Sequence, residues 1–135
     1  MPESELHRFY VSQIVKYIEE TYCADDERLI VTDLIDESVR PPRIDNYVPD
    51  VFYNSQITGD TVIGEAKSCG DISANRSIKQ IQAFIKYCND VNAILIIAVP
   101  WDEYSTAINI VRNFCRRMNI SIQFKILMFL PRDIL

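Results

Sequence analysis

Two carboxylates and one ammonium group stand close together near the middle of this sequence, at Asp50, Glu65 and Lys67. The stretch that holds them reads VPDVFYNSQITGDTVIGEAK, and two short apolar runs within it, 47–53 and 61–66, flank a turn-rich spacer. This pattern predicts two neighbouring strands joined by a loop. Ionised groups are costly to bury without partners or a metal ion, so the trio indicates an ion-binding site rather than core packing.

The period of a strand decides which of these side chains can meet. Residues two apart in a strand point to the same face, so Glu65 and Lys67 project together and the small Ala66 turns the other way. If the run that contains Asp50 pairs with the run that ends at Glu65, its carboxylate reaches the same place. We therefore expect the three charged groups to converge at one end of a sheet.

The sequence Pro49-Asp50, followed by a spacer and by Glu65-Ala66-Lys67, resembles the motif of the PD-(D/E)XK nuclease superfamily. That superfamily includes many restriction endonucleases, Holliday-junction resolvases and repair nucleases. The resemblance covers roughly residues 3–99 and implies a restriction-endonuclease-like core in the order α-β-β-β-α-β. It also implies a metal-dependent nuclease that hydrolyses phosphodiester bonds, most simply in DNA, with Mg²⁺ as cofactor and Mn²⁺ able to substitute.

The resemblance also implies a role for each residue of the motif. Asp50 and Glu65 would bind the metal ion, and the carbonyl of Ala66 would add a third ligand. Hard cations such as Mg²⁺ prefer oxygen ligands and keep several waters, one of which becomes more acidic. Lys67 would position that water or help to deprotonate it. The alternative is an aspartate in a turn and a solvated strand end with a weak surface ion pair.

Many members of the superfamily carry a further acid on the first helix, and Glu5 is the best match here. Its alternative role is that of a first-turn acid, which the helix dipole favours. Other acids on the same predicted helix remain candidates: Glu3, Glu19 and Glu20. His7 is interpreted as a surface or satisfied histidine, with contact to a phosphate as the less favoured role.

The helix after Lys67 would supply a polar residue facing the site. Gln80 fits that role, with Gln82 as the alternate and a solvated helix face as the other interpretation. Basic residues that can contact backbone phosphate are Arg76, Lys79, Lys86, Arg40, Arg43, Arg112, Arg116 and Arg117. Each is also an ordinary surface charge, and only clustering around the site would make it part of a nucleic-acid interface.

Length and composition indicate a single domain, residues 1–135, with one core. No apolar run approaches the roughly 20 residues that a membrane helix needs, and the acidic N-terminus lacks the form of a signal peptide. We therefore expect no membrane association and a cytoplasmic location. The four cysteines form no CxxC pair, which favours free, mostly buried thiols over a zinc site.

The net charge of −5 counts against strong nonspecific DNA binding by the bare monomer. It leaves open a partner subunit that supplies DNA affinity. It also motivates a second hypothesis, in which the same fold serves as a noncatalytic module that binds nucleic acid or protein. A homodimer is a further expected assembly, with exposed apolar surface on the last strand as its interface.

Hydrophobic periodicity predicts elements in the order α-β-β-β-α-β-α-β, and the resemblance then implies an α/β fold with a central mixed sheet flanked by helices. A C-terminal helix and strand would be added to the α-β-β-β-α-β core. The expected helices are 3–22, with Ser4 as N-cap, 75–88 and 102–118. The expected strands are 29–35, 47–53, 61–66, 92–99 and 120–128, and 37–46 is expected to be a loop.

Overall fold

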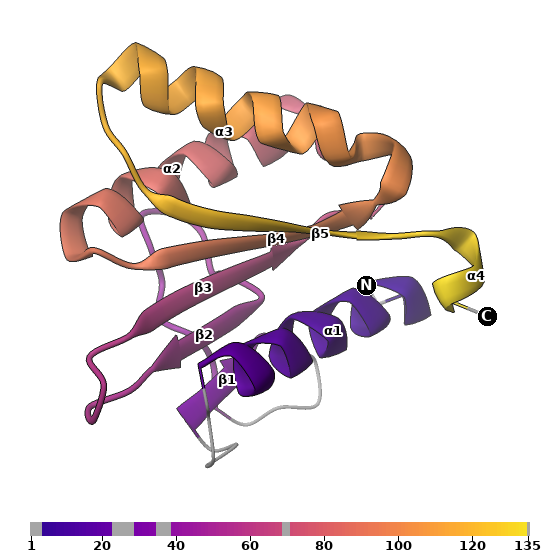
Figure 1. Cartoon of the computed structure of the whole chain (residues 1–135), viewed down its shortest axis with the longest axis horizontal. Coiled ribbons are helices and arrows are strands. Elements are labelled where there is room, and N and C mark those ends of the chain that lie inside the picture. The colour runs from indigo at the N-terminus through magenta and orange to yellow at the C-terminus, as the bar shows by residue number, and fades with distance from the viewer. Residues whose placement is uncertain (1–3, 23–28, 35–38, 69–70, 135) are drawn as a thin grey trace.

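Five strands form one mixed sheet with helices on both faces (Figure 1). The computed structural model describes residues 4–22, 29–34, 39–68 and 71–134. The helices are α1 (Glu5–Thr21), α2 (Asn75–Val91), α3 (Tyr104–Met118) and the short α4 (Pro131–Ile134). The strands are β1 (Ile30–Thr32), β2 (Val51–Asn54), β3 (Thr61–Ala66), β4 (Ile94–Pro100) and β5 (Gln123–Phe129). The predicted α/β class is therefore confirmed.

The strand order β1-β2-β3-β4-β5 follows the chain, and the pairing changes direction at β3. β1, β2 and β3 form an antiparallel meander, whereas β4 is parallel to β3 and β5 is parallel to β4. Parallel neighbours need a crossover connection, and α2 and α3 provide the two crossovers. Both crossover helices cover one face of the sheet, and α1 covers the other (Figure 1).

The first helix begins at Ser4, as predicted, because its side chain accepts a hydrogen bond of 3.0 Å from the His7 N–H. Its buried face is formed by residues at helical spacing, namely Tyr10, Val11, Ile14 and Ile18. These side chains pack against β2, β3 and β4. Burial of four large apolar side chains is enough to hold α1 against the sheet.

Gly64 lets α1 come close to the middle of β3. A Cβ atom at this position would lie 2.6 Å from Cγ2 of Ile14 and 3.2 Å from Cβ of Val51. Carbon atoms do not approach to 2.6 Å, so a larger residue at this position would force Ile14 or its helix to shift. Glu65 follows directly, and the close approach therefore fixes the strand that carries it.

The almost wholly apolar run at 94–99 is buried on both faces as β4. This is the expected pattern for a central parallel strand that helices cover from both sides. Ile96 and Ala98 contact the layer of α1, whereas Leu95, Ile97 and Val99 contact the layer of α2 and α3. The sheet thus separates two apolar clusters, and polar groups can gather only at its ends.

Several predicted boundaries were wrong by a few residues. The strand predicted at 29–35 is reduced to Ile30–Thr32, and residues 35–38 lie outside the described part of the chain. The strand predicted at 47–53 begins only at Val51, because an isolated bridge between Ile44 and Tyr47 turns the chain first. Pro49 also lacks the N–H that a strand ladder requires. Asp50 therefore precedes β2 instead of lying within it.

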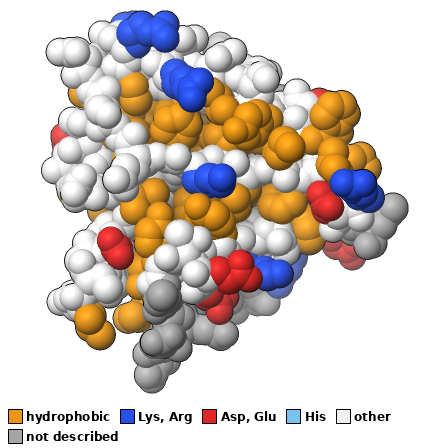
Figure 2. All heavy atoms as spheres, viewed as in Figure 1, with side chains coloured by type: hydrophobic (Ala, Val, Ile, Leu, Met, Phe, Trp, Pro, Cys, Tyr) orange, Lys and Arg blue, Asp and Glu red, His pale blue; other side chains and the backbone are white. Residues whose placement is uncertain are grey.

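The third predicted helix and the last predicted strand also shift. Residues 101–103 form a single 3₁₀ turn, and α3 begins at Tyr104. The last strand covers Gln123–Phe129 instead of 120–128, and Met128, predicted on its apolar face, is 51% exposed. Figure 2 shows hydrophobic side chains on this side of the molecule, above and below β5. Among the described helices, none is long and apolar enough to cross a membrane.

Candidate functional site

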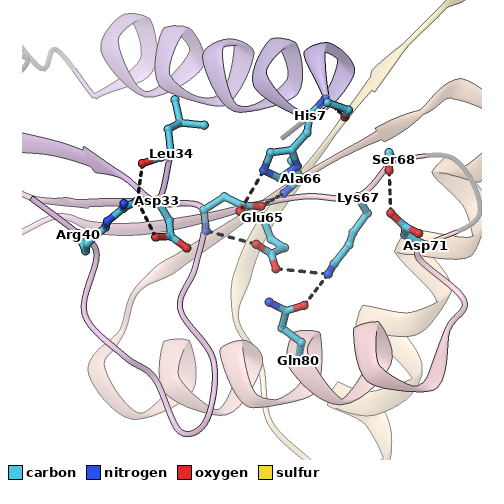
Figure 3. A network of polar contacts seen from close by, with 12 residues as sticks. His7, Asp33, Leu34, Arg40, Glu65, Ala66, Lys67, Ser68, Asp71 and Gln80 are labelled. Atoms are coloured by element: carbon cyan, nitrogen blue, oxygen red, sulfur yellow. Dashed lines mark hydrogen bonds and ion pairs between the residues drawn. The ribbon is translucent and has the colours of Figure 1, made fainter. Parts of the chain in front are cut away.

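The register of β2 and β3 brings Asp50 beside Glu65. Val51 pairs with Gly64, so the residue before Val51 and the residue after Gly64 are neighbours across the ladder. The Ala66 N–H donates to Asp50 Oδ2 at 2.8 Å, and the Asp50 N–H donates to Glu65 Oε1 at 3.3 Å (Figure 3). The two carboxyl groups also lie within hydrogen-bond reach of each other. The predicted convergence of these two residues is therefore present.

Lys67 completes the trio from the same face of β3. Its Nζ lies 3.4 Å from Glu65 Oε2 and donates a hydrogen bond of 2.5 Å to Gln80 Oε1 (Figure 3). Ala66 faces the opposite apolar cluster, as the strand period predicts. Gln80 was expected to contact a water or a site carboxylate, but its partner here is the ammonium group of Lys67.

The face of α1 also contributes His7, which was interpreted as a surface or satisfied histidine and which here has Asp50 as its partner. His7 Nε2 lies 3.4 Å from Asp50 Oδ1, and its side chain is 25% exposed. His7 stands four residues before Val11 and seven before Ile14, so helical spacing puts it on the buried face. That spacing was the signal available in the sequence, and it was applied only to apolar residues.

The surroundings of the two carboxyl groups shift their pKa values in opposite directions. Burial and the neighbouring Asp50 carboxylate hold the pKa of Glu65 well above its usual range, against the opposing effect of Lys67. Burial also acts to raise the pKa of Asp50, but hydrogen bonds from His7 and Glu65 outweigh it and leave that pKa below its usual value. Without a bound cation, Glu65 therefore keeps its proton to a higher pH than Asp50 does.

The donor set fits a hard divalent cation better than it fits zinc. Among the residues that the structure describes, no three His, Cys, Asp or Glu side chains are arranged to hold a metal ion. Asp50 and Glu65 nevertheless offer carboxylate oxygens at one point, and Mg²⁺ is commonly bound through one or two carboxylates while it keeps several waters. The raised pKa of Glu65 is the physical sign of a carboxylate pair that lacks enough positive charge. A divalent cation would supply that charge.

The predicted acid on the first helix does not join this cluster. Glu5 is exposed in the first turn of α1, and its assignment as a metal ligand stays a prediction. Glu19 and Glu20 lie at the far end of the helix, about 18 Å along its axis from His7. Glu3 lies outside the described residues.

A third carboxylate, Asp33, lies beside the motif and was not predicted. Its N–H donates to the Asp50 carbonyl at 2.8 Å, because the pairing of β1 with β2 continues one residue past Thr32. The Asp33 side chain pairs with Arg40 at 3.2 Å, and Arg40 also donates to the Leu34 carbonyl (Figure 3). Arg40 was one of the basic residues that can contact phosphate, and in this structure it pairs with the Asp33 carboxylate.

The other predicted basic residues lie on the surface around α2. Arg76 stacks over the Tyr47 ring at 5.6 Å from its centroid, and Lys79 is exposed. Arg43 is exposed and contacts the Asn46 carbonyl at 3.5 Å. Gln82, the alternate to Gln80, makes no contact with the trio.

The arrangement joins an acid pair, an oriented ammonium group and a histidine at one end of the sheet. Such a set can bind a divalent cation and can hold a water or a phosphate oxygen against it. No protein-family model, no curated protein and no solved structure matches this chain. The site must therefore be interpreted from its own chemistry.

Proposed function

We propose that this chain is a metal-dependent nuclease that hydrolyses phosphodiester bonds, most simply in DNA, with a site of the PD-(D/E)XK type. The observation that carries the proposal is the convergence of Asp50, Glu65 and Lys67 at the end of β3. Glu65 is 2% exposed, and its burial next to a second carboxylate is unfavourable for the fold. A binding function for a cation explains why the pair is placed there.

The geometry of Lys67 supports a role in holding a reactant. An ammonium group has three N–H donors, and here one contacts Glu65 and another contacts Gln80. The third remains for a water or a phosphate oxygen. Because both partners fix the direction of the group, Lys67 would offer this donor without further ordering.

Asp50 and Glu65 would hold the metal ion, with the carbonyl of Ala66 as the third ligand that the motif implies. A bound Mg²⁺ or Mn²⁺ would acidify a water and offset the charge of the phosphate. His7 would hold one oxygen of Asp50 in place, and the Ala66 N–H would hold the other. These contacts leave the carboxylate little freedom to rotate before a cation binds.

The fold supports the same proposal. An antiparallel β1-β2-β3 meander after a helix, followed by α2 and a parallel β4, agrees with the restriction-endonuclease-like core in the order α-β-β-β-α-β. The added α3 and β5 extend the sheet at the β4 side. A nuclease of this kind would act in the cytoplasm, as a monomer or as a homodimer formed through the exposed edge of β5. A partner subunit would be a further source of affinity for DNA.

The direct test is cleavage of supercoiled plasmid, linear duplex and single-stranded DNA, and of RNA, with Mg²⁺, with Mn²⁺ and with a chelator. We expect metal-dependent cleavage that is lost in Asp50→Ala and in Lys67→Ala. The matched controls are Glu20→Ala and Lys16→Ala, which remove the same charges at exposed positions of α1, thirteen and nine residues past His7. Cleavage that survives both site substitutions would reject the assignment.

A noncatalytic module is the second candidate, and the acidic net charge of −5 favours it. Calorimetry separates the two functions. If neither Mg²⁺ nor Mn²⁺ binds, and if Glu65→Ala leaves binding to a nucleic-acid or protein partner intact, the trio serves the fold alone. Binding of either ion that is lost in Glu65→Ala supports the nuclease.

A further inference from the structure

The charges of this protein are separated between the two helical layers. The helices α2 and α3, which share one face of the sheet, carry six basic residues and one acidic residue, Asp90. The basic residues are Arg76, Lys79, Lys86, Arg112, Arg116 and Arg117. On the opposite face, α1 carries three acidic and two basic residues. A chain with a net charge of −5 thus presents one locally basic surface, which we call the basic face.

The cations of the basic face have no acidic partner within the described part of the chain. All six are exposed, and none forms an ion pair with any residue that the structure describes. By contrast, the site lysine and Arg40 both have carboxylate partners. In Figure 2 the Lys and Arg side chains over α3 have no acidic side chain between them. Like charges gathered without counter-charges are unfavourable, unless an anion from outside the chain lies over them.

Two of these cations converge on a single aromatic ring. Lys86 Nζ from α2 lies 5.8 Å from the centroid of the Phe114 ring, and Arg117 Cζ from α3 lies 5.3 Å from it. They therefore lie no more than about 11 Å apart, across the junction of the two helices. Because Phe114 is 5% exposed, the ring holds both stems in place against the surface. The pair is ordered before any anion binds.

Helix stability does not explain the basic residues at the start of α2. Arg76 and Lys79 stand in the first turns of a helix that begins at Asn75, where the helix dipole disfavours positive charge. Arg116 and Arg117 occupy the last turn of α3, where the dipole favours them. The dipole thus accounts for one end of the basic face only. At the other end, beside Gln80, Arg76 stacks over the Tyr47 ring, so Lys79 is the residue whose position neither the dipole nor a described contact explains.

The spacing of the cations fits a polyanion that leaves the candidate site along α2. Lys79 and Lys86 are seven residues apart, so they share a face and lie about 10 Å apart along the axis. From Arg76 to Lys86 the rise is about 15 Å. One strand of a nucleic acid carries a phosphate for about every 3.4 Å of helix axis, so about five phosphates would span the row of cations from Arg76 to Lys86.

We infer that the basic face of α2 and α3 binds the phosphate backbone of a nucleic acid and guides it to the end of β3. The inference rests on the proposed function for the identity of the polyanion. The row of cations begins beside Gln80, which contacts Lys67, so one strand can lie across both. An acidic protein would also neutralise the basic face, but its binding would not require that face to begin beside Asp50, Glu65 and Lys67. The binding is expected to be independent of sequence, because these contacts reach phosphates and not base edges.

Binding measured in a chelator tests the inference separately from cleavage. The probes are a fluorescein-labelled single strand and the corresponding duplex, titrated with the full chain at several salt concentrations and followed by fluorescence anisotropy. Each phosphate contact adds about one to the slope of log affinity against log salt. We expect Lys86→Gln/Arg117→Gln to lower that slope by about two and to weaken binding at low salt by about tenfold or more.

A second double variant, Arg112→Gln/Arg116→Gln, leaves the two cations over the Phe114 ring in place. It keeps the inference testable if the first double variant does not fold. We expect it to weaken binding as well, whereas Lys16→Gln on α1 leaves affinity and slope unchanged. Undetectable binding by the wild type, or equal binding by all four proteins, would overturn the inference. So would displacement of the probe by polyglutamate as readily as by unlabelled DNA, since that outcome assigns the face to an acidic protein. Failure of cleavage with this binding intact would instead reject only the proposed nuclease.

Discussion

Glu65→Gln is the substitution whose effect follows most directly from the structure. Glutamine has nearly the same shape as glutamate, and its amide oxygen can still accept the hydrogen bond from the Asp50 N–H. Its NH₂ group then stands in the place of Oε2, the oxygen that faces Lys67 Nζ. The substitution loses the ion pair with Lys67, but Lys67 keeps its bond to Gln80. It therefore removes a buried charge while it preserves most of the local contacts.

The expected effect on the metal-free protein is stabilisation. Each unit by which the pKa of Glu65 is raised corresponds to about 1.4 kcal/mol of unfavourable free energy for the ionised form at neutral pH. Replacement of a complete buried ion pair by neutral groups of similar volume is neutral or stabilises by about 1–4 kcal/mol, and here the ammonium group that stays behind keeps Gln80 as its partner. We expect a gain of roughly 2 kcal/mol, which for a domain of this size raises Tm by about 5–10 °C.

The dependence of folding stability on pH tests the direction of this effect a second time. In the unfolded chain Glu65 ionises near its model value of 4.5, whereas in the fold its pKa is higher. Between these two values the folded state binds more protons, so the stability of the wild type decreases as pH rises through that interval. At pH values above the pKa of Glu65 in the folded state, the loss of stability stays constant. Glu65→Gln lacks the group and should not show this decrease.

A divalent cation should reverse the order of stability. A cation that binds the native carboxylate pair raises the Tm of the wild type by linkage, and Glu65→Gln has lost one of the two ligands. Differential scanning fluorimetry in chelator and in Mg²⁺ or Mn²⁺ therefore measures both effects, with Glu20→Gln as the control at an exposed position. Destabilisation of the chelated protein by Glu65→Gln, or an equal response of both proteins to the ion, would refute the reasoning.

Three further predictions concern the fold around the site. Gly64→Ala should destabilise the protein by about 1–3 kcal/mol in urea unfolding, because its Cβ would meet Cγ2 of Ile14, and the loss should be smaller in an Ile14→Ala background, which lacks that atom. Full stability of Gly64→Ala would show that α1 can move away freely. Because the pKa of Asp50 lies below its usual 3.8, the wild type should lose stability as pH falls from 3.8 through the folded pKa, and Asp50→Asn should lose less. An equally steep loss of stability at acid pH in Asp50→Asn and in the wild type would contradict this. Burial raises the pKa of the Cys88 thiol to about 12, so mass spectrometry should find Cys88 unmodified by iodoacetamide at pH 8 in the native protein and modified after denaturation. Native modification of Cys88 ahead of the half-buried Cys115 would contradict its burial.

The sequence was sufficient to predict the helices, the strand at 61–66 and the meeting of Asp50 with Glu65. These features depend on local periodicity and on the two-residue repeat of a strand, which a sequence displays directly. The first and last strands were predicted too long, because apolar alternation continues into segments that have no partner strand. Asp50 was placed within its strand for the same reason, although Pro49 already limited the pairing.

The residues around the trio were harder to predict, because they come from other elements. Glu5 was chosen for its charge, but the direction of a helix face decides which residue reaches the site, and His7 occupies that face. Asp33 was not predicted, because its position opposite Asp50 depends on the register between β1 and β2, which no local sequence pattern specifies. The basic face depends on the packing of α2 against α3, which only the fold reveals.

The most direct measurement of the central claim is an anomalous difference map from a crystal of the full chain soaked in Mn²⁺. The account predicts one strong peak between the carboxyl groups of Asp50 and Glu65, within about 2.2 Å of an oxygen of each. It predicts no such peak in a soaked crystal of Glu65→Gln. A map with no peak at the end of β3, or with Mn²⁺ only on exposed carboxylates, would contradict it.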